Sequence, residues 1–142
     1  MKVTHHDPTE AMRIAEATTV AGFARMAVAD VSGGDSDPTT YAVAYFIGPA
    51  PKPDPIKAVV VPTIHLNTVA PSDDPQPWEK PKYITVVASG KRPDGCAASV
   101  SYLTASVPEP QISESHLTAE QLDEVRAGSK IFIRLSVTGC GS

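Results

Sequence analysis

The chain contains two cysteines, Cys96 and Cys140, which are its best candidates for covalent chemistry. A bond between them would close a loop of about 45 residues and would stabilise the fold by about 4 kcal/mol in the chain-entropy model. The strand pattern speaks against the bond, because Cys96 shares an apolar face with Val100 whereas Cys140 shares a polar face with Arg134. One extra residue at Gly139 would reverse that relation.

Three interpretations of the cysteines therefore stay open. Cys96 and Cys140 form a disulfide, or they are two separate structural thiols, or one of them is a nucleophile. The first residues of the chain contain no apolar leader segment, which favours reduced thiols. No histidine adjoins either cysteine in sequence, so nothing local would activate a thiolate.

The histidines and acidic residues do not form a pattern typical of a metal site. His5-His6-Asp7 lacks the spacing that places two imidazoles on one ion, and Asp7 is a good helix N-cap. The loop 30–37 is rich in aspartate but lacks the ordered ligand spacing of an EF-hand. His65 and His116 are expected to be structural. We therefore predict no metal, no cofactor and no catalytic residue, since the usual hydrolase, kinase and nucleotide-binding motifs are also missing.

Proline is concentrated in the middle of the chain. Nine of the 14 prolines lie between positions 49 and 81, mainly in the segments 49–55 and 71–81. Rigid loops lose little entropy on binding, and tryptophan is enriched at binding hot spots. The candidate partner-contact residues are Pro51, Pro53, Pro77 and Trp78. The alternative interpretation is that both loops are stiff connections and that Trp78 covers the rim of the core.

Most of the chain has the patterns of β-strands. Runs of alternating or β-branched residues predict strands, and Arg92-Pro93-Asp94-Gly95 predicts a tight turn between two of them. The predicted strands are Thr40–Ile47, Ile56–Val61, Ile64–Val69, Tyr83–Ser89, Cys96–Val107 and Ile131–Val137. The segment Val20–Val31 fits either a strand or a helix, and we predict a strand.

Two segments have helix signals. Asp7-Pro8 provides an N-cap and a first-turn proline for a short helix with a small apolar face. Residues 1–18 would then form an N-terminal helical arm that contributes to assembly. Thr118-Ala119-Glu120-Gln121 is a capping box, and Gly128 stands where a helix would end.

Together these elements predict one mainly β domain over residues 1–142. We expect an antiparallel β-sandwich or small barrel of about six or seven strands, with a short N-terminal helix and a short capped helix before the last strand. Hydrophobic residues make up 42% and charged residues 20%, which is typical of a globular domain. The net charge of −4 argues against nucleic acid as a partner, and no apolar run reaches the roughly 18 residues of a membrane helix.

Three functional hypotheses follow. The first is a structural protein that self-associates as a homo-oligomer, such as a virion, tail or decoration component; small size, mild charge and stiff loops favour it. The second is an immunoglobulin-like recognition module that binds a protein or glycan through the proline-rich loops. The third is a small enzyme or inhibitor whose site is built from distant residues.

The expected partner is another copy or another protein, with no membrane. The absence of a visible signal peptide favours cytoplasmic synthesis or a virion, with a mature secreted chain as the alternative.

Overall fold

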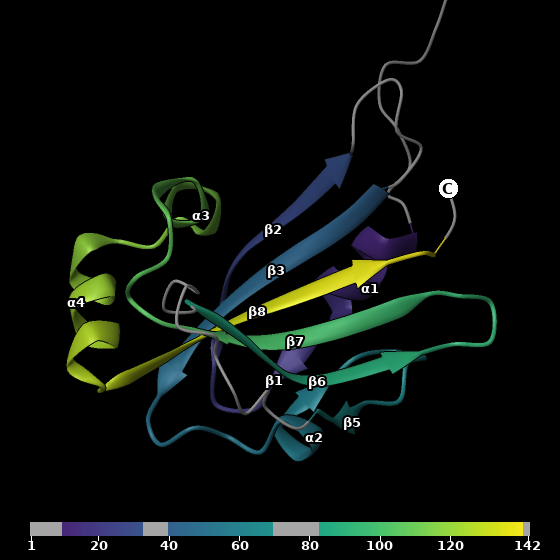
Figure 1. Cartoon of the computed structure of the whole chain (residues 1–142), viewed down its shortest axis with the longest axis horizontal. Coiled ribbons are helices and arrows are strands. Elements are labelled where there is room, and N and C mark those ends of the chain that lie inside the picture. The colour runs from purple at the N-terminus through teal and green to yellow at the C-terminus, as the bar shows by residue number, and fades with distance from the viewer. Residues whose placement is uncertain (1–9, 33–39, 70–82, 141–142) are drawn as a thin grey trace, which may run out of the picture.

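A computed structural model describes residues 10–32, 40–69 and 83–140 of the chain (Figure 1). These residues form a mainly β fold of two antiparallel sheets, one of six strands and one of two. The strands are β1 (Thr19–Val20), β2 (Ala24–Ser32), β3 (Thr40–Pro49), β4 (Val59–Val60), β5 (Asn67–Thr68), β6 (Ile84–Lys91), β7 (Ala97–Leu103) and β8 (Lys130–Thr138). The helices are α1 (Glu10–Ala17), α2 (Pro55–Ala58), α3 (Glu109–Ser115) and α4 (Ala119–Ala127). None of these helices is long and apolar enough to cross a bilayer.

The large sheet has the strand order β2-β3-β8-β7-β6-β5, and every neighbouring pair is antiparallel. β2 with β3, and β6 with β7, are neighbours in sequence. β8 comes last in the chain but lies between β3 and β7, so it joins the two halves of the sheet (Figure 1).

One face of the large sheet carries the first core. Alternate residues of β3, β7 and β8 point to this face, as the period of two in a strand requires. α1 and the segment that includes β4 cover them, so that Ile14 and Ala15 of α1 are 5% and 0% exposed. The sheet residues of the first core include Ala42, Ala44, Phe46, Ala98, Val100, Ile133, Leu135 and Val137.

The opposite face carries a second core beneath α3 and α4. Its buried residues are Val43, Tyr45, Ile47, Leu103, Val107, Leu117 and Phe132. Ile112 of α3 and both Leu122 and Val125 of α4 pack against them. Figure 1 shows α3 and α4 together at one end of the sheet, away from α1.

The mainly antiparallel β fold is confirmed, together with both predicted helices. Thr118 and Gln121 exchange the two hydrogen bonds of a capping box, and α4 ends at Gly128 with φ 83°. The Arg92–Gly95 turn closes with a hydrogen bond of 3.0 Å from the Gly95 amide to the Arg92 carbonyl. The segment Val20–Val31 is largely strand, although a turn at Ala21 and Gly22 divides β1 from β2.

Two predictions about local structure are wrong in part. The run Ile56–Val61 begins as helix α2, because the Asp54 side chain accepts a hydrogen bond from the Ile56 amide and Pro55 occupies the first helical turn. Of Ile64–Val69, only Asn67–Thr68 is strand. α1, which belongs to the predicted N-terminal arm, packs in the first core.

One helix was not predicted at all. α3 follows Pro108, which offers no side-chain cap, and it ends at His116 in the left-handed conformation with φ 61°. The Asp7 N-cap, the pair His5-His6, residues 33–37 of the aspartate-rich loop and the segment 71–81 lie outside the described residues.

Candidate functional site

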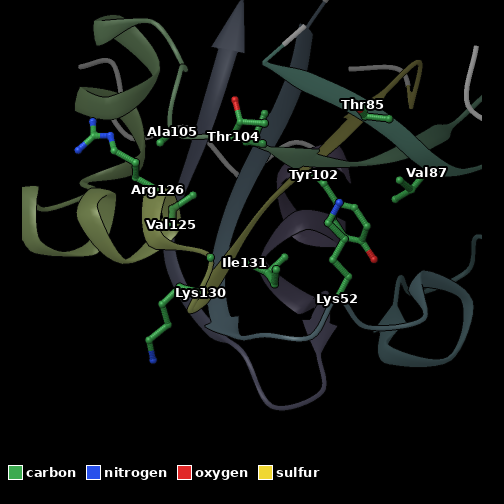
Figure 2. Close-up of a pocket in the computed structure, with 12 residues that line it drawn as sticks. Lys52, Thr85, Val87, Tyr102, Thr104, Ala105, Val125, Arg126, Lys130 and Ile131 are labelled. Carbon is green, nitrogen blue, oxygen red and sulfur yellow. The ribbon is translucent and has the colours of Figure 1, made fainter.

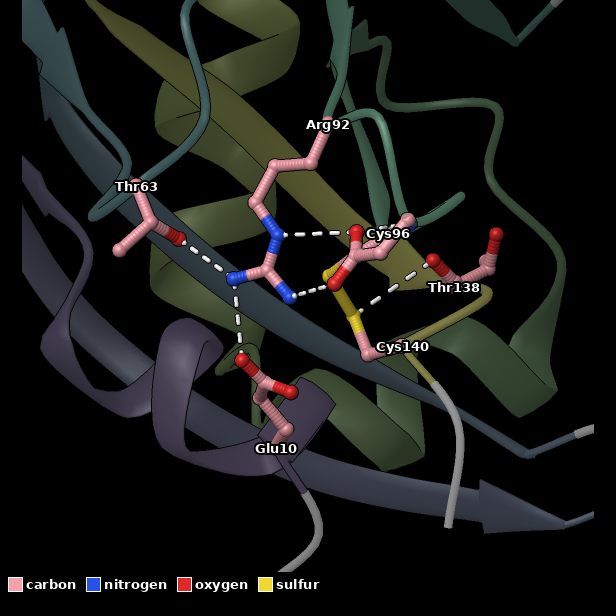
Figure 3. Close-up of a disulfide and its surroundings, with 7 residues drawn as sticks. Glu10, Thr63, Arg92, Cys96, Thr138 and Cys140 are labelled. Carbon is pink, nitrogen blue, oxygen red and sulfur yellow. Dashed lines mark hydrogen bonds and ion pairs between the residues drawn. A yellow bond between two sulfur atoms is a disulfide. The ribbon is translucent and has the colours of Figure 1, made fainter.

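The two cysteines are joined in the structure (Figure 3). Their sulfur atoms lie 1.98 Å apart and their Cα atoms 4.0 Å apart. Ala97 and Thr138 are a cross-strand pair; Cys96 is one residue before Ala97, and Cys140 is two residues after Thr138. As disulfide sulfurs, neither is free to act as a nucleophile.

Gly139 explains how both cysteines reach the same side of the sheet. Its φ of +72° turns the chain after β8 in a conformation that residues with a side chain rarely adopt. A Cβ atom at this position would also lie 2.5 Å from the carbonyl oxygen of Gly95. The strand alternation that separates Cys140 from Cys96 therefore ends before Cys140.

Arg92 ties the disulfide hairpin to two other parts of the fold (Figure 3). Its guanidinium donates to Asp94 at 2.6 Å, to the hydroxyl of Thr63 at 2.8 Å and to Glu10 of α1 at 2.9 Å. Asp94 in turn accepts from the Cys96 amide at 3.1 Å. The hydrogen bond from Arg92 lowers the pKa of Asp94, so the carboxylate stays ionised to a lower pH than an ordinary aspartate does. These contacts hold the hairpin against α1 and the segment around Thr63, which is a structural role.

A pocket of about 620 Å³ opens between α4, the start of β8 and strands β6 and β7 (Figure 2). Its apolar lining comes from residues of all these elements: Val87, Leu103, Ala105, Val125 and Ile131. In Figure 2, Ile131 lies near the middle of the group and Val125 and Ala105 lie on the α4 side. The volume falls within the range typical of small-molecule sites.

The charged residues that line the pocket are all cationic. Lys52 follows β3, Arg126 is in the last turn of α4, and Lys130 begins β8. Among the described residues that line the pocket, none is an aspartate or a glutamate. The ammonium group of Lys52 lies 5.3 Å from the centre of the Tyr102 ring, a cation–π contact.

The predicted loop 49–55 forms part of the support of this pocket. The hydroxyl of Tyr102 donates to the carbonyl oxygen of Pro53, and burial, followed by the charge of Asp54, raises the pKa of Tyr102. Pro53 is partly buried, whereas Pro51 is exposed. Pro77 and Trp78 lie outside the described residues, so their role as contact residues stays a prediction.

A second polar cluster lies beneath α3. The hydroxyl of Tyr45 donates to a carboxylate oxygen of Glu114 at 2.7 Å, and Arg134 is the cross-strand neighbour of Tyr45. Tyr45 is fully buried. Burial, together with the hydrogen bond to Glu114, raises the pKa of Tyr45 from 10.0 to about 12.

This raised pKa predicts a loss of stability in alkali. Because the folded state holds the Tyr45 proton more tightly than the unfolded state, the contribution is complete below pH 10.0 and is lost as the pH rises towards about 12. We expect the free energy of unfolding to fall over that window in wild type and to fall less in Tyr45→Phe. Urea titrations at several pH values would measure it; parallel curves for the two proteins would contradict it.

The outer edge of β2 is the third feature. β2 is the terminal strand of the large sheet, and within residues 10–32, 40–69 and 83–140 no strand pairs with its outer side. The strand is nine residues long and bulges between Arg25 and Ala27. From Ala27 to Ser32 it contains no proline, glycine or lysine, and Asp30 is its one charged residue.

Sequence patterns identified the cysteines but neither the pocket nor the Tyr45 cluster. Lys52, Tyr102 and Lys130 are far apart in sequence and share no motif, so only the fold brings them together. Neither His65 nor His116 lines this pocket. Comparison of the chain with models of known protein families, with curated proteins and with solved structures finds no match.

Proposed function

We propose that the protein is a structural component of the virion, tail or decoration type, and that it self-associates through the outer edge of β2. The observation that carries this proposal is the edge from Ala27 to Ser32, with which no strand pairs in the described part of the chain. An edge strand presents unpaired amide and carbonyl groups to any chain that can add a strand. Natural sheets usually block such edges with short strands, prolines, lysines or bulges.

The other end of the large sheet has two of these features, a short terminal strand and an irregular register, and the contrast supports the proposal. The terminal strand there, β5, is only two residues long. Its neighbour β6 has an irregular register between Val86 and Ala88. β2 has its bulge only near Arg25, which leaves the following six residues regular.

A second copy of the chain fits this edge geometrically. Two copies related by a two-fold axis perpendicular to the sheet would pair their β2 strands antiparallel and continue the sheet from one subunit into the other. The sequence permits such pairing about Ala27, Val28 or Ala29, since none of these registers places Arg25 opposite Arg25 or Asp30 opposite Asp30. The small side chains of Ala27 and Ala29 leave room for a close approach.

The test is the mass in solution, measured by size-exclusion chromatography with light scattering. We expect wild type to be a dimer or larger and Ala29→Lys to shift towards the monomer mass of 14.9 kDa, because lysine on an edge disfavours strand addition. Ser106→Lys adds the same charge at an exposed position outside β2 and should leave the oligomer unchanged. A wild-type protein that stays at 14.9 kDa at high micromolar concentration would refute the proposal.

Cysteine crosslinking would locate the contact. Three variants would each carry one introduced cysteine, at position 27, 28 or 29. At least one of them should form an intermolecular disulfide, because a residue near the two-fold axis faces its own copy. Lys57→Cys, at an exposed position of α2, is the matched control and should stay uncrosslinked. Equal crosslinking at position 57 would indicate random collision instead of a β2 contact.

The disulfide favours a second candidate, the recognition module. A bond between Cys96 and Cys140 suits an oxidising compartment, where such modules act. The division into six and two strands differs from the more even division of an immunoglobulin domain. A monomer that loses stability in reductant would favour this candidate, and an oligomer indifferent to reductant would favour the structural role.

A further inference from the structure

We propose that the pocket between α4, β6, β7 and β8 binds an amphipathic organic anion, with an apolar body inside the pocket and a carboxylate or sulfonate head at its rim. This site is separate from the proposed β2 contact, because β2 and β6 lie towards opposite ends of the large sheet. The inference rests on the shape of the pocket, its lining and the placement of its charges.

The interior of the pocket suits an apolar body. Val87, Leu103, Val125 and Ile131 come from β6, β7, α4 and β8, so the apolar surface surrounds a ligand from several directions. A cavity of about 620 Å³ holds a molecule the size of a medium-chain fatty acid or a bicyclic aromatic acid. Removing such a body from water favours binding in proportion to the apolar surface that becomes buried.

The rim favours a negative head group. Lys52, Arg126 and Lys130 all line the pocket, although the whole chain has a net charge of −4. Figure 2 shows Lys52 lying along Tyr102, whereas Arg126 and Lys130 extend away from the apolar centre. Cations at the rim over an apolar interior match a ligand that is charged at one end only.

Two of these cations are free of carboxylates in the part of the chain that the structure describes. Neither Lys52 nor Lys130 forms an ion pair with any described residue. Arg126 pairs with Asp123 at 2.7 Å, but the two side chains are 61% and 72% exposed. An ion pair so exposed contributes little, so Arg126 can turn to a ligand at small cost.

The probes are 8-anilinonaphthalene-1-sulfonate, followed by its fluorescence, and decanoate as a competitor. We expect saturable sulfonate binding to wild type, displacement by decanoate, and weaker displacement by the neutral decanol. The double variant Lys52→Gln/Lys130→Gln should raise the Kd of both anions about tenfold, as expected for loss of charge-assisted contacts. The affinity of wild type should fall as the ionic strength rises from about 0.01 M to about 1 M.

Lys57→Gln is the control, because it removes an exposed lysine that does not line the pocket and should leave the Kd unchanged. Thermal unfolding of each variant would establish that the fold is intact. The inference is overturned if wild type shows no saturable binding, if decanol competes as well as decanoate, or if the double variant binds both anions as tightly as Lys57→Gln does.

Discussion

Loss of the Cys96–Cys140 disulfide is expected to lower the free energy of unfolding by about 4 kcal/mol. The bond joins residues 44 apart in sequence, so breaking it releases a long loop in the unfolded chain. It also fixes the start of β7 to the end of β8 in the middle of the large sheet. Since a small domain has a total stability of about 5–15 kcal/mol, this loss would be a large fraction.

Denaturant titration of oxidised wild type and of Cys96→Ala/Cys140→Ala would measure the difference. Reductant should lower the midpoint of wild type and leave that of the double variant unchanged. The intact mass of wild type should be lower than the sequence mass by the two hydrogens lost on oxidation. Rapid alkylation of both thiols in the native protein would show instead that the cysteines are separate.

The cysteines also show where strand periodicity stops being informative. The alternation of Ile133, Leu135 and Val137 correctly predicted one buried face of β8, and counting onwards placed Cys140 on the other face. That count fails at Gly139, whose positive φ ends the strand before Cys140. A glycine permits this conformation but does not require it, so the sequence left the pairing open.

Local capping explains both a success and a failure of prediction. The capping box at Thr118 and the glycine at 128 predicted α4 because they pair the free amide and carbonyl groups at the two ends of a helix. These patterns are specific to helix ends. Asp54-Pro55 is a comparable start signal for α2, but the β-branched residues after it dominated the pattern. The sequence therefore contained a start signal for α2, but the β-branched residues led to the prediction of a strand.

The pocket and the second core depend on contacts between distant segments. α3 begins after Pro108 without a side-chain cap, and nothing in its short sequence indicates that it covers the sheet. Lys52 and Lys130 are brought to one rim only because β3 and β8 pair antiparallel, with Pro49 opposite Lys130. These two residues become neighbours through the order of the strands in the sheet, and local sequence patterns do not reveal that order.

The second core leads to the other large effect that we expect. Phe132 lies on the face of β8 that also carries Arg134 and Ser136, which the sequence pattern presented as polar, yet it is fully buried. Its ring stacks on that of Tyr45 with centroids 5.7 Å apart. Truncation would leave a cavity between the sheet and the α3–α4 layer, so Phe132→Ala should cost about 4 kcal/mol of stability.

Val86→Ala is the comparison variant, because Val86 is 41% exposed and its truncation should cost less than about 0.5 kcal/mol. Urea titration of both variants would measure the two losses. If α3 and α4 pack firmly on the sheet, Phe132→Ala must lower the free energy of unfolding far more than Val86→Ala does. Removal of the ring leaves a cavity only where a packed layer covers it. Similar small losses in both variants would mean that the sheet face opposite α1 is open to water, and the wall that α4 gives the pocket would then lose its support.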